Sequence, residues 1–155
     1  MKIIFSCILM IVLQQPSIFI KGNGFSGYIF DADHFVMASI ENQKTRYTPD
    51  NSDIILAEKL VSKQLKGLNH LKINQHDNCP VIHNKLSKYV RQYVGFINNS
   101  EEKVIWVNCL WEESGHLKDI DKRIIPVKDG CSQYWSVKVN LQSQKVYNLN
   151  INGSS

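Results

Sequence analysis

The sequence predicts an α+β fold, in which one main helix packs on a curved four-stranded antiparallel sheet with one or more extra N-terminal strands. Two observations indicate this architecture. Apolar residues recur at three- and four-residue spacing before residue 67, and they alternate with polar residues after residue 88. A helix and a sheet that are each apolar on one side are stabilised by packing those sides together.

The length and composition are those of one globular domain. The chain has 155 residues, of which 43% are hydrophobic and 21% are charged, and we expect a single domain over residues 25–153. The formal charge of +4 is small and spread along the sequence. It therefore does not predict nucleic-acid binding.

The first residues are typical of a secretory signal. Met1-Lys2 is basic, residues 3–13 are apolar apart from Ser6 and Cys7, and Gln14-Gln15-Pro16 follows. Such a run is too short to span a bilayer. We expect residues 1–21 to be a signal peptide, with cleavage between residues 17 and 27. The mature chain would be periplasmic or extracellular, without a membrane span. The alternative is an uncleaved anchor.

The strongest helix signal covers residues 49–66. Thr48 is a suitable N-cap, Pro49 suits the first helical position, and Gly67 suits the end. The apolar stripe consists of Ile54, Ala57, Val61 and Leu65. Before the helix, residues 28–40 are rich in aromatic and β-branched residues, which predicts one or two strands there.

Alternation after residue 88 predicts two hairpins. The first pairs residues 89–97 with 104–111, and the second pairs residues 134–141 with 147–152. Between the two hairpins, residues 123–127 are expected to be extended. Four antiparallel strands that each have one apolar side would curl over the helix.

Several of these segments also resemble known proteins. Tyr47-Thr48-Pro49, Arg91-Gln92-Tyr93-Val94-Gly95-Phe96-Ile97 and Val104-Ile105-Trp106-Val107-Asn108-Cys109 resemble a group of small exported bacterial proteins that have no assigned function. The resemblance extends over residues 48–153. It implies export and contributes no catalytic residues.

The order of helix and strands resembles the cystatin-like architecture. Cystatin protease inhibitors carry Gln-x-Val-x-Gly in their first hairpin. Here Gln92-Tyr93-Val94-Gly95 is one residue shorter and falls along a predicted strand. The resemblance therefore implies a fold and does not imply protease inhibition.

Three cysteines remain when Cys7 is removed with the signal. Cys79, Cys109 and Cys131 allow three single disulfides, and the sequence does not choose among them. A Cys109–Cys131 bridge is geometrically reasonable, because Cys131 opens the strand expected beside the one that holds Cys109.

A cluster of metal-ligand residue types lies between the helix and the first hairpin. It consists of His70, His76, Cys79 and His83. Imidazole and thiolate are zinc ligands, but this spacing matches no established zinc pattern. The alternative is a polar loop, and we expect no cofactor.

Aromatic side chains on the predicted strands are the main candidates for ligand binding. Trp106, Trp111 and Tyr134, with Arg91, are the residues chosen as a binding surface. The alternative is cross-strand packing for the aromatic residues and solvation for Arg91.

Together these patterns favour an exported, non-enzymatic module that binds a protein, peptide or surface component. No catalytic residues are identified. One alternative is a small hydrolase or metal-dependent enzyme that uses the link 70–83 and the loop near Glu112. A second is a structural subunit of an envelope assembly.

Overall fold

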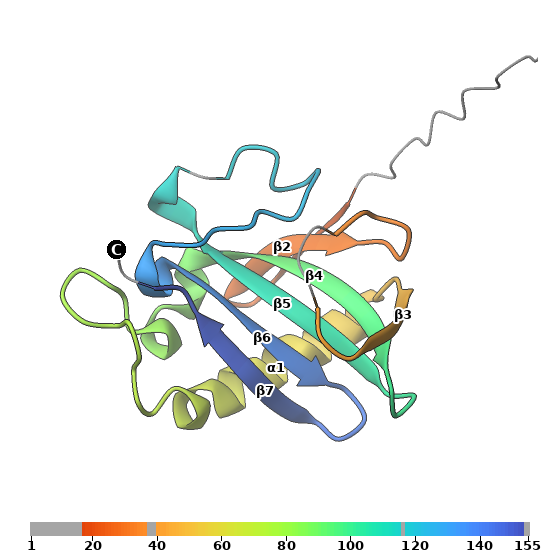
Figure 1. Cartoon of the computed structure of the whole chain (residues 1–155). Coiled ribbons are helices and arrows are strands. Elements are labelled where there is room, and N and C mark those ends of the chain that lie inside the picture. The colour runs from red at the N-terminus through yellow and green to blue at the C-terminus, as the bar shows by residue number, and fades with distance from the viewer. Residues whose placement is uncertain (1–16, 37–39, 116, 154–155) are drawn as a thin grey trace, which may run out of the picture.

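The computed structural model describes residues 17–36, 40–115 and 117–153. The described residues form one α-helix and a mostly antiparallel sheet of seven strands (Figure 1). The elements are β1 (Ile18–Gly22), β2 (Phe25–Phe30), β3 (Gln43–Tyr47), α1 (Asn51–Leu68), β4 (Tyr89–Asn98), β5 (Lys103–Trp111), β6 (Tyr134–Asn140) and β7 (Lys145–Ile151). Short 3-10 turns are η1 (Ile82–Asn84), η2 (Leu86–Lys88), η3 (Glu112–Ser114) and η4 (Cys131–Gln133). The α+β class and the presence of extra N-terminal strands are confirmed, but three strands precede the helix, which makes the sheet seven-stranded.

The strand β4 is the centre of the sheet. The strands β4, β5, β6 and β7 form an antiparallel meander, as the two predicted hairpins require. The other edge of β4 is shared, because β2 runs parallel to its first half and β3 runs antiparallel to its second half. The strand β1 forms a hairpin with β2 and ends the sheet on that side.

A glycine allows β2 to lie beside β4. Gly27 pairs with Arg91 in the parallel register. A side-chain carbon at Gly27 would come within 2.4 Å of the Arg91 carbonyl oxygen and 2.8 Å of the Tyr93 ring. Any larger residue would therefore push the hairpin away from the sheet.

The helix α1 begins and ends two residues later than its sequence pattern predicts. Its N-cap is Asp50, whose Oδ1 accepts a hydrogen bond from the Asp53 amide at 2.9 Å. Thr48, the predicted cap, instead accepts from the Ala32 amide through its Oγ1 at 2.9 Å and so holds the chain after β2. Gly67 lies inside the last turn and does not end the helix.

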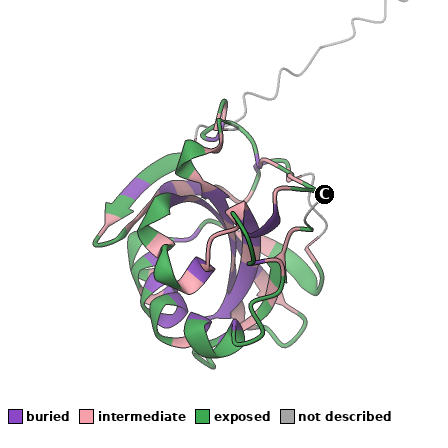
Figure 2. Ribbon diagram, turned by 90° about the vertical axis from the view of Figure 1, so that its left-hand side faces the viewer, coloured by how far each residue is buried: buried purple, intermediate pink, exposed green. Residues whose placement is uncertain are grey.

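The main core lies between α1 and one face of the sheet. The predicted stripe of α1 is confirmed as buried, and it packs in the same cluster as Tyr93, Ile105, Val107, Val137 and Val139. Figure 2 shows the sheet curving around the helix, with buried residues where the two meet. Burial of this apolar area is the main stabilising contribution to the fold.

The opposite face of the sheet is covered by the loop between β5 and β6. Gln92 is fully buried there. Its Nε2 donates to the Ile120 and Arg123 carbonyls at 2.8 and 2.7 Å, and its Oε1 accepts from the Ile125 amide at 3.0 Å. Residues 123–127 are therefore fixed against the sheet without belonging to a strand. Gln92 lies within β4, as expected, and not at a hairpin tip.

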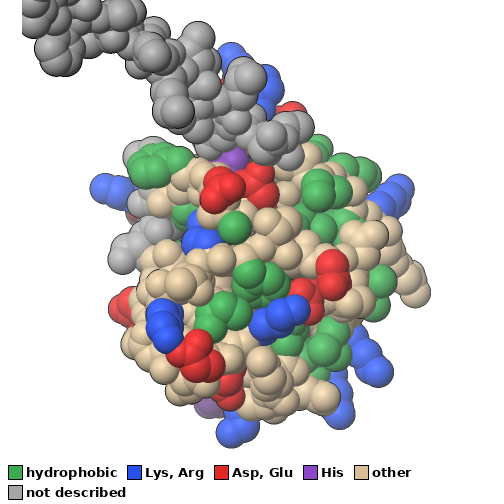
Figure 3. All heavy atoms as spheres, turned by 90° about the vertical axis from the view of Figure 1, so that its right-hand side faces the viewer, with side chains coloured by type: hydrophobic (Ala, Val, Ile, Leu, Met, Phe, Trp, Pro, Cys, Tyr) green, Lys and Arg blue, Asp and Glu red, His purple; other side chains and the backbone are tan. Residues whose placement is uncertain are grey.

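Charged side chains of both signs are mixed on the surface that Figure 3 displays. Lys and Arg lie beside Asp and Glu on this face, with apolar side chains between them. That face therefore offers no single-sign patch of the kind that attracts nucleic acid. Among the described residues, no helix has the length and apolar character needed to cross a membrane.

The strand β1 overlaps the predicted signal peptide. The apolar run of the predicted leader lies outside the described residues, but residues 18–21 belong to β1. Ile20 is 8% exposed and packs in the main core together with Ile29 of β2. The leader itself stays a prediction, and the structure supplies a reason for its cleavage to occur early.

We predict that the mature exported chain begins at or before Ile18. Cleavage after residue 21 would remove Ile20 from the core and leave the edge of β2 unpaired, at a cost of about 2–5 kcal/mol for the lost side chain alone. Mass spectrometry of the N-terminal peptide from secreted protein checks this. A mature N-terminus at residues 22–27 would contradict it.

Candidate functional site

A groove of about 720 Å³ lies beside α1 and could hold a ligand. One wall is the β1–β2 hairpin from Ile20 to Phe25, and the other is the face of α1 that contains Asn51, Ile55 and Ser62. The turns η1 and η2 close one side of the groove. Its volume lies in the range of ligand-binding sites in proteins.

A buried ion pair lies at the bottom of this groove. Arg91 Nε is 3.4 Å from Glu58 Oε1, and the two side chains are 2% and 9% exposed. The Tyr93 hydroxyl donates to the same Glu58 oxygen at 2.9 Å, and Arg91 Nη1 donates to the Tyr89 carbonyl. Both charged residues also line the groove. The pair is therefore fixed by hydrogen bonds beneath the groove.

The local structure explains why two charged side chains lie between the helix and the sheet. Glu58 is four residues after Ile54 and three before Val61, so it belongs to the buried stripe of α1. Arg91 lies between Tyr89 and Tyr93 on the side of β4 that faces the helix. Each residue follows the periodicity of its own element and meets the other in the core.

The groove carries a positive charge overall. Burial raises the pKa of Glu58 above its usual value, while the Arg91 charge and the Tyr93 hydrogen bond act against this rise. Because Arg91 balances Glu58, the exposed side chains of Lys21 and Lys59 set the sign. Among the described residues that line the groove, Glu58 is the one carboxylate.

His83 lies on the same groove and adds little charge at neutral pH. Partial burial lowers the pKa of His83 below its usual value, and the nearby charges of Lys72 and Lys66 lower it further. Its Nδ1 is 2.9 Å from Asn69 Nδ2. The imidazole is therefore a neutral polar group on this wall.

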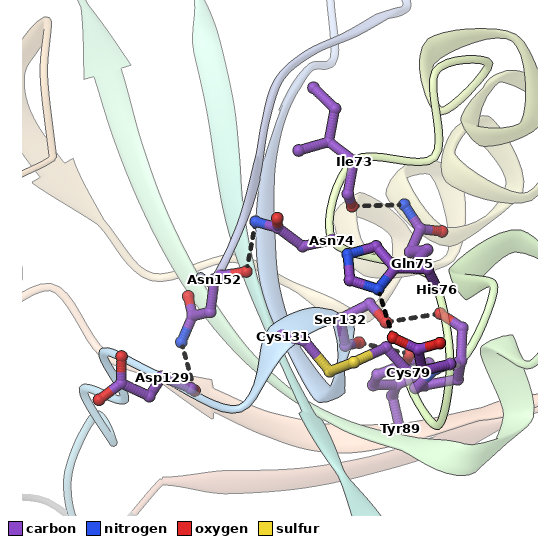
Figure 4. The surroundings of a disulfide bond; sticks show 12 residues. Ile73, Asn74, Gln75, His76, Cys79, Tyr89, Asp129, Cys131, Ser132 and Asn152 are labelled. Carbon is purple, nitrogen blue, oxygen red and sulfur yellow. Dashed lines mark hydrogen bonds and ion pairs between the residues drawn. A yellow bond between two sulfur atoms is a disulfide. The ribbon is translucent and has the colours of Figure 1, made fainter. Parts of the chain in front are cut away.

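The disulfide joins Cys79 to Cys131 (Figure 4). Cys109 is a buried free thiol, so the Cys109–Cys131 bridge expected from the sequence is corrected. The register of β5 and β6 pairs Cys109 with Trp135, which places Cys131 four residues away along the chain. The observed bridge links the loop after α1 to the start of β6, where Ser132 Oγ also donates to the Pro80 carbonyl at 2.6 Å.

The predicted metal ligands do not come together. Cys79 is in the disulfide, and the three histidines contact Gly67, Asp77 and Asn69 respectively. Over residues 17–36, 40–115 and 117–153, no group of three or more His, Cys, Asp or Glu side chains is arranged to hold a metal ion. The set His70, His76, Cys79 and His83 is therefore not assembled as a metal site, because a disulfide has taken its thiol.

The predicted binding residues divide between the two faces of the sheet. Arg91 and Trp111 lie on the helix side, where the Trp111 ring packs edge-on against Tyr89 with centroids 5.1 Å apart. Trp106 and Tyr134 lie on the opposite side, and Tyr134 is buried beneath the loop after β5. The four residues do not form one surface. Arg91 lines the groove, and the alternative of a solvated side chain is wrong, because Arg91 is buried.

Sequence reasoning missed Glu58, the partner of Arg91. A signal was present, because Glu58 interrupts the apolar stripe and Arg91 interrupts the apolar phase of β4. Opposite charges that break the apolar faces of two elements expected to pack together indicate a buried pair.

No family model, curated protein or solved structure matches this chain. The resemblance to small exported bacterial proteins therefore stays a prediction.

We predict that Arg91→Met lowers the free energy of unfolding by about 3–5 kcal/mol, because it leaves the Glu58 carboxylate buried without its partner. The double variant Glu58→Leu/Arg91→Met should recover most of this loss. Arg123→Met, the same change at an exposed position, should change stability by less than about 0.5 kcal/mol. Urea denaturation measures all three. Equal losses in the single and double variants would contradict a buried pair.

We also predict that removing the disulfide lowers stability. Closing a loop between residues 52 positions apart restricts the unfolded chain, which is worth up to about 4 kcal/mol. Cys79→Ser/Cys131→Ser should therefore unfold about 2–4 kcal/mol more easily in urea, and reductant should weaken the wild type but not the variant. A bridged Cys109 in peptide mapping would show that the pairing is different.

Proposed function

We propose that this protein is an exported, non-enzymatic binding module and that the groove between the β1–β2 hairpin and α1 is its ligand site. The observation that carries this proposal is the Arg91–Glu58 pair at the bottom of the groove. A buried ion pair is a poor source of net stability, since apolar residues of similar volume often stabilise as well or better. Its position against a cavity therefore supports a role in recognition.

The arrangement supports binding more than proton transfer. Glu58 Oε1 already lies within reach of two donors, and Arg91 donates to the backbone of Tyr89. Groups fixed in this way are preorganised and keep their geometry when a ligand arrives. The proposed enzyme alternative used the link 70–83, whose only thiol is in the disulfide of the described structure. No observation favours it.

The disulfide supports the exported part of the proposal. Cys79 and Cys131 are bonded across two loops, and such bonds persist in oxidising compartments outside the cytosol. This agrees with a cleaved N-terminal signal, which has to end before β1 (Ile18–Gly22) for that strand to stay in the mature chain. The compartment itself, periplasmic or extracellular, is left open by this argument.

The cystatin-like layout is also part of the proposal. The path from β3 through α1 to the meander β4–β7 has the order that the sequence suggested, with β3 antiparallel to β4. The β1–β2 hairpin is then an addition at the free half of the β4 edge. The layout supports no inhibitor function here, because Gln92 is fully buried.

Binding to a defined panel of probes tests the proposed function. The probes are small organic acids, small amines and random peptides, added to the isotope-labelled mature chain. We expect binders to shift the amide resonances of Lys21, Phe25 and Lys59. Ser62→Trp should fill the groove and weaken binding about tenfold or more, whereas Lys63→Trp, one residue further on the exposed helix surface, should not.

The proposal fails if the binders shift amides elsewhere on the protein. It also fails if Ser62→Trp binds them as well as the wild type does. Circular dichroism of both tryptophan variants checks that α1 is intact.

A further inference from the structure

We propose that the groove takes an extended peptide with acidic side chains, which adds as a new strand along the free edge of β1. This inference rests on the proposed function and names the ligand class. It is carried by the shape of the groove, the free strand edge and the charge of the walls.

The first wall is the edge strand β1, whose outer side carries backbone N–H and C=O groups that can bond to an added strand. Within the described residues, β1 pairs with no strand except β2. Gly22 and Phe25 flank a two-residue turn that has Gly24 at φ 79°, so this pair closes the hairpin. Alternation along an antiparallel pair then leaves the N–H and C=O groups of Phe19 and Lys21 directed away from β2.

The edge at β1 differs from the opposite edge of the sheet. The opposite edge strand is β7, which has Asn148 at φ 50° and an irregular register against β6. Such irregularities discourage the addition of another strand. The β1–β2 register is regular over its whole length. A peptide can therefore continue the sheet at β1.

The second wall sets the length of the occupant. Asn51 and Ser62 both line the groove, and eleven helical residues rise about 16 Å. An extended chain covers about 3.4 Å per residue, so about five residues fit along α1. A groove bounded by a strand edge and a helix in this way suits an extended chain better than a compact ligand.

The side chains of the groove indicate the composition of the peptide. Ile55 is a large apolar residue with 58% of its surface exposed, and it lines the groove with Phe25 and Leu86. Alternate residues of an added strand could cover these apolar groups. Lys59 is four residues after Ile55 on the same face of α1, so it favours an acidic residue among the side chains that face the helix. Lys21 alternates with the core residue Ile20, so it favours an acidic residue at the intervening positions.

The same charges make a second copy of the chain a poor occupant. A copy that added through its own β1 would bring another Lys21 to the same edge. Two like charges brought to one strand edge repel each other, which opposes this pairing. An acidic peptide has the opposite effect on this edge, because it neutralises the lysines.

Selection from a displayed library of random peptides of about eight residues tests the inference, with the mature chain as the target. We expect the selected peptides to be rich in Asp and Glu. For a synthetic peptide from this set, Lys59→Glu should weaken binding about tenfold. Lys63→Glu makes the same charge change outside the groove and should weaken binding less than about threefold.

Methylation of single peptide amides tests strand addition directly. An added strand uses every second amide to bond β1, so N-methylation at alternate positions should weaken binding about tenfold. N-methylation at the intervening positions should have little effect. A peptide that binds in any other way would not show this alternation.

The outcomes separate this inference from the proposed function. If small acids shift the groove amides but no peptide is selected, or if N-methylation shows no alternation, the strand-addition proposal is overturned and the binding module stands. Concentration-dependent dimerisation that protects the β1 amides from exchange would replace the peptide with a second copy. Peptides that bind Ser62→Trp normally would overturn both proposals.

Discussion

The packing of one face of α1 on the curved sheet is the constraint on which the rest of the structure depends. Ile54, Ala57, Val61 and Leu65 are buried against the sheet, and Glu58 lies in the same stripe. A carboxylate in that position needs a partner, because an isolated buried charge is strongly unfavourable. Arg91 supplies the partner, and the groove lies where the pair meets the surface.

The elements that could be predicted are those whose periodicity comes from this packing. The helix and the four strands of the meander each have one buried side, so their apolar residues recur at the expected spacing. The helix α1 starts two residues later than predicted because Asp50 caps it, while Thr48 accepts a hydrogen bond from the Ala32 amide. Sequence alone does not show which of two suitable cap residues has another partner elsewhere.

The first three strands could not be read in the same way. Residues of β3 are exposed or half-buried, so they have no apolar alternation. The strand β1 follows directly on an apolar segment that looks like a leader. Pairing of β2 with β4 depends on Gly27 and a contact across more than sixty residues, and local patterns carry little information about such contacts.

The candidate site depends on the same non-local contacts, which is why its residues were only partly identified. Arg91 was selected from the sequence, but for an exposed strand face. Its real environment requires β2 beside it, since Gly27 pairs with Arg91 and β1 completes the wall. The β1–β2 hairpin and the Arg91–Glu58 pair line the same groove. The hairpin therefore supplies one wall of the groove and presents the outer edge of β1 at the same place. The element that sequence analysis described least well is thus one wall of the candidate site.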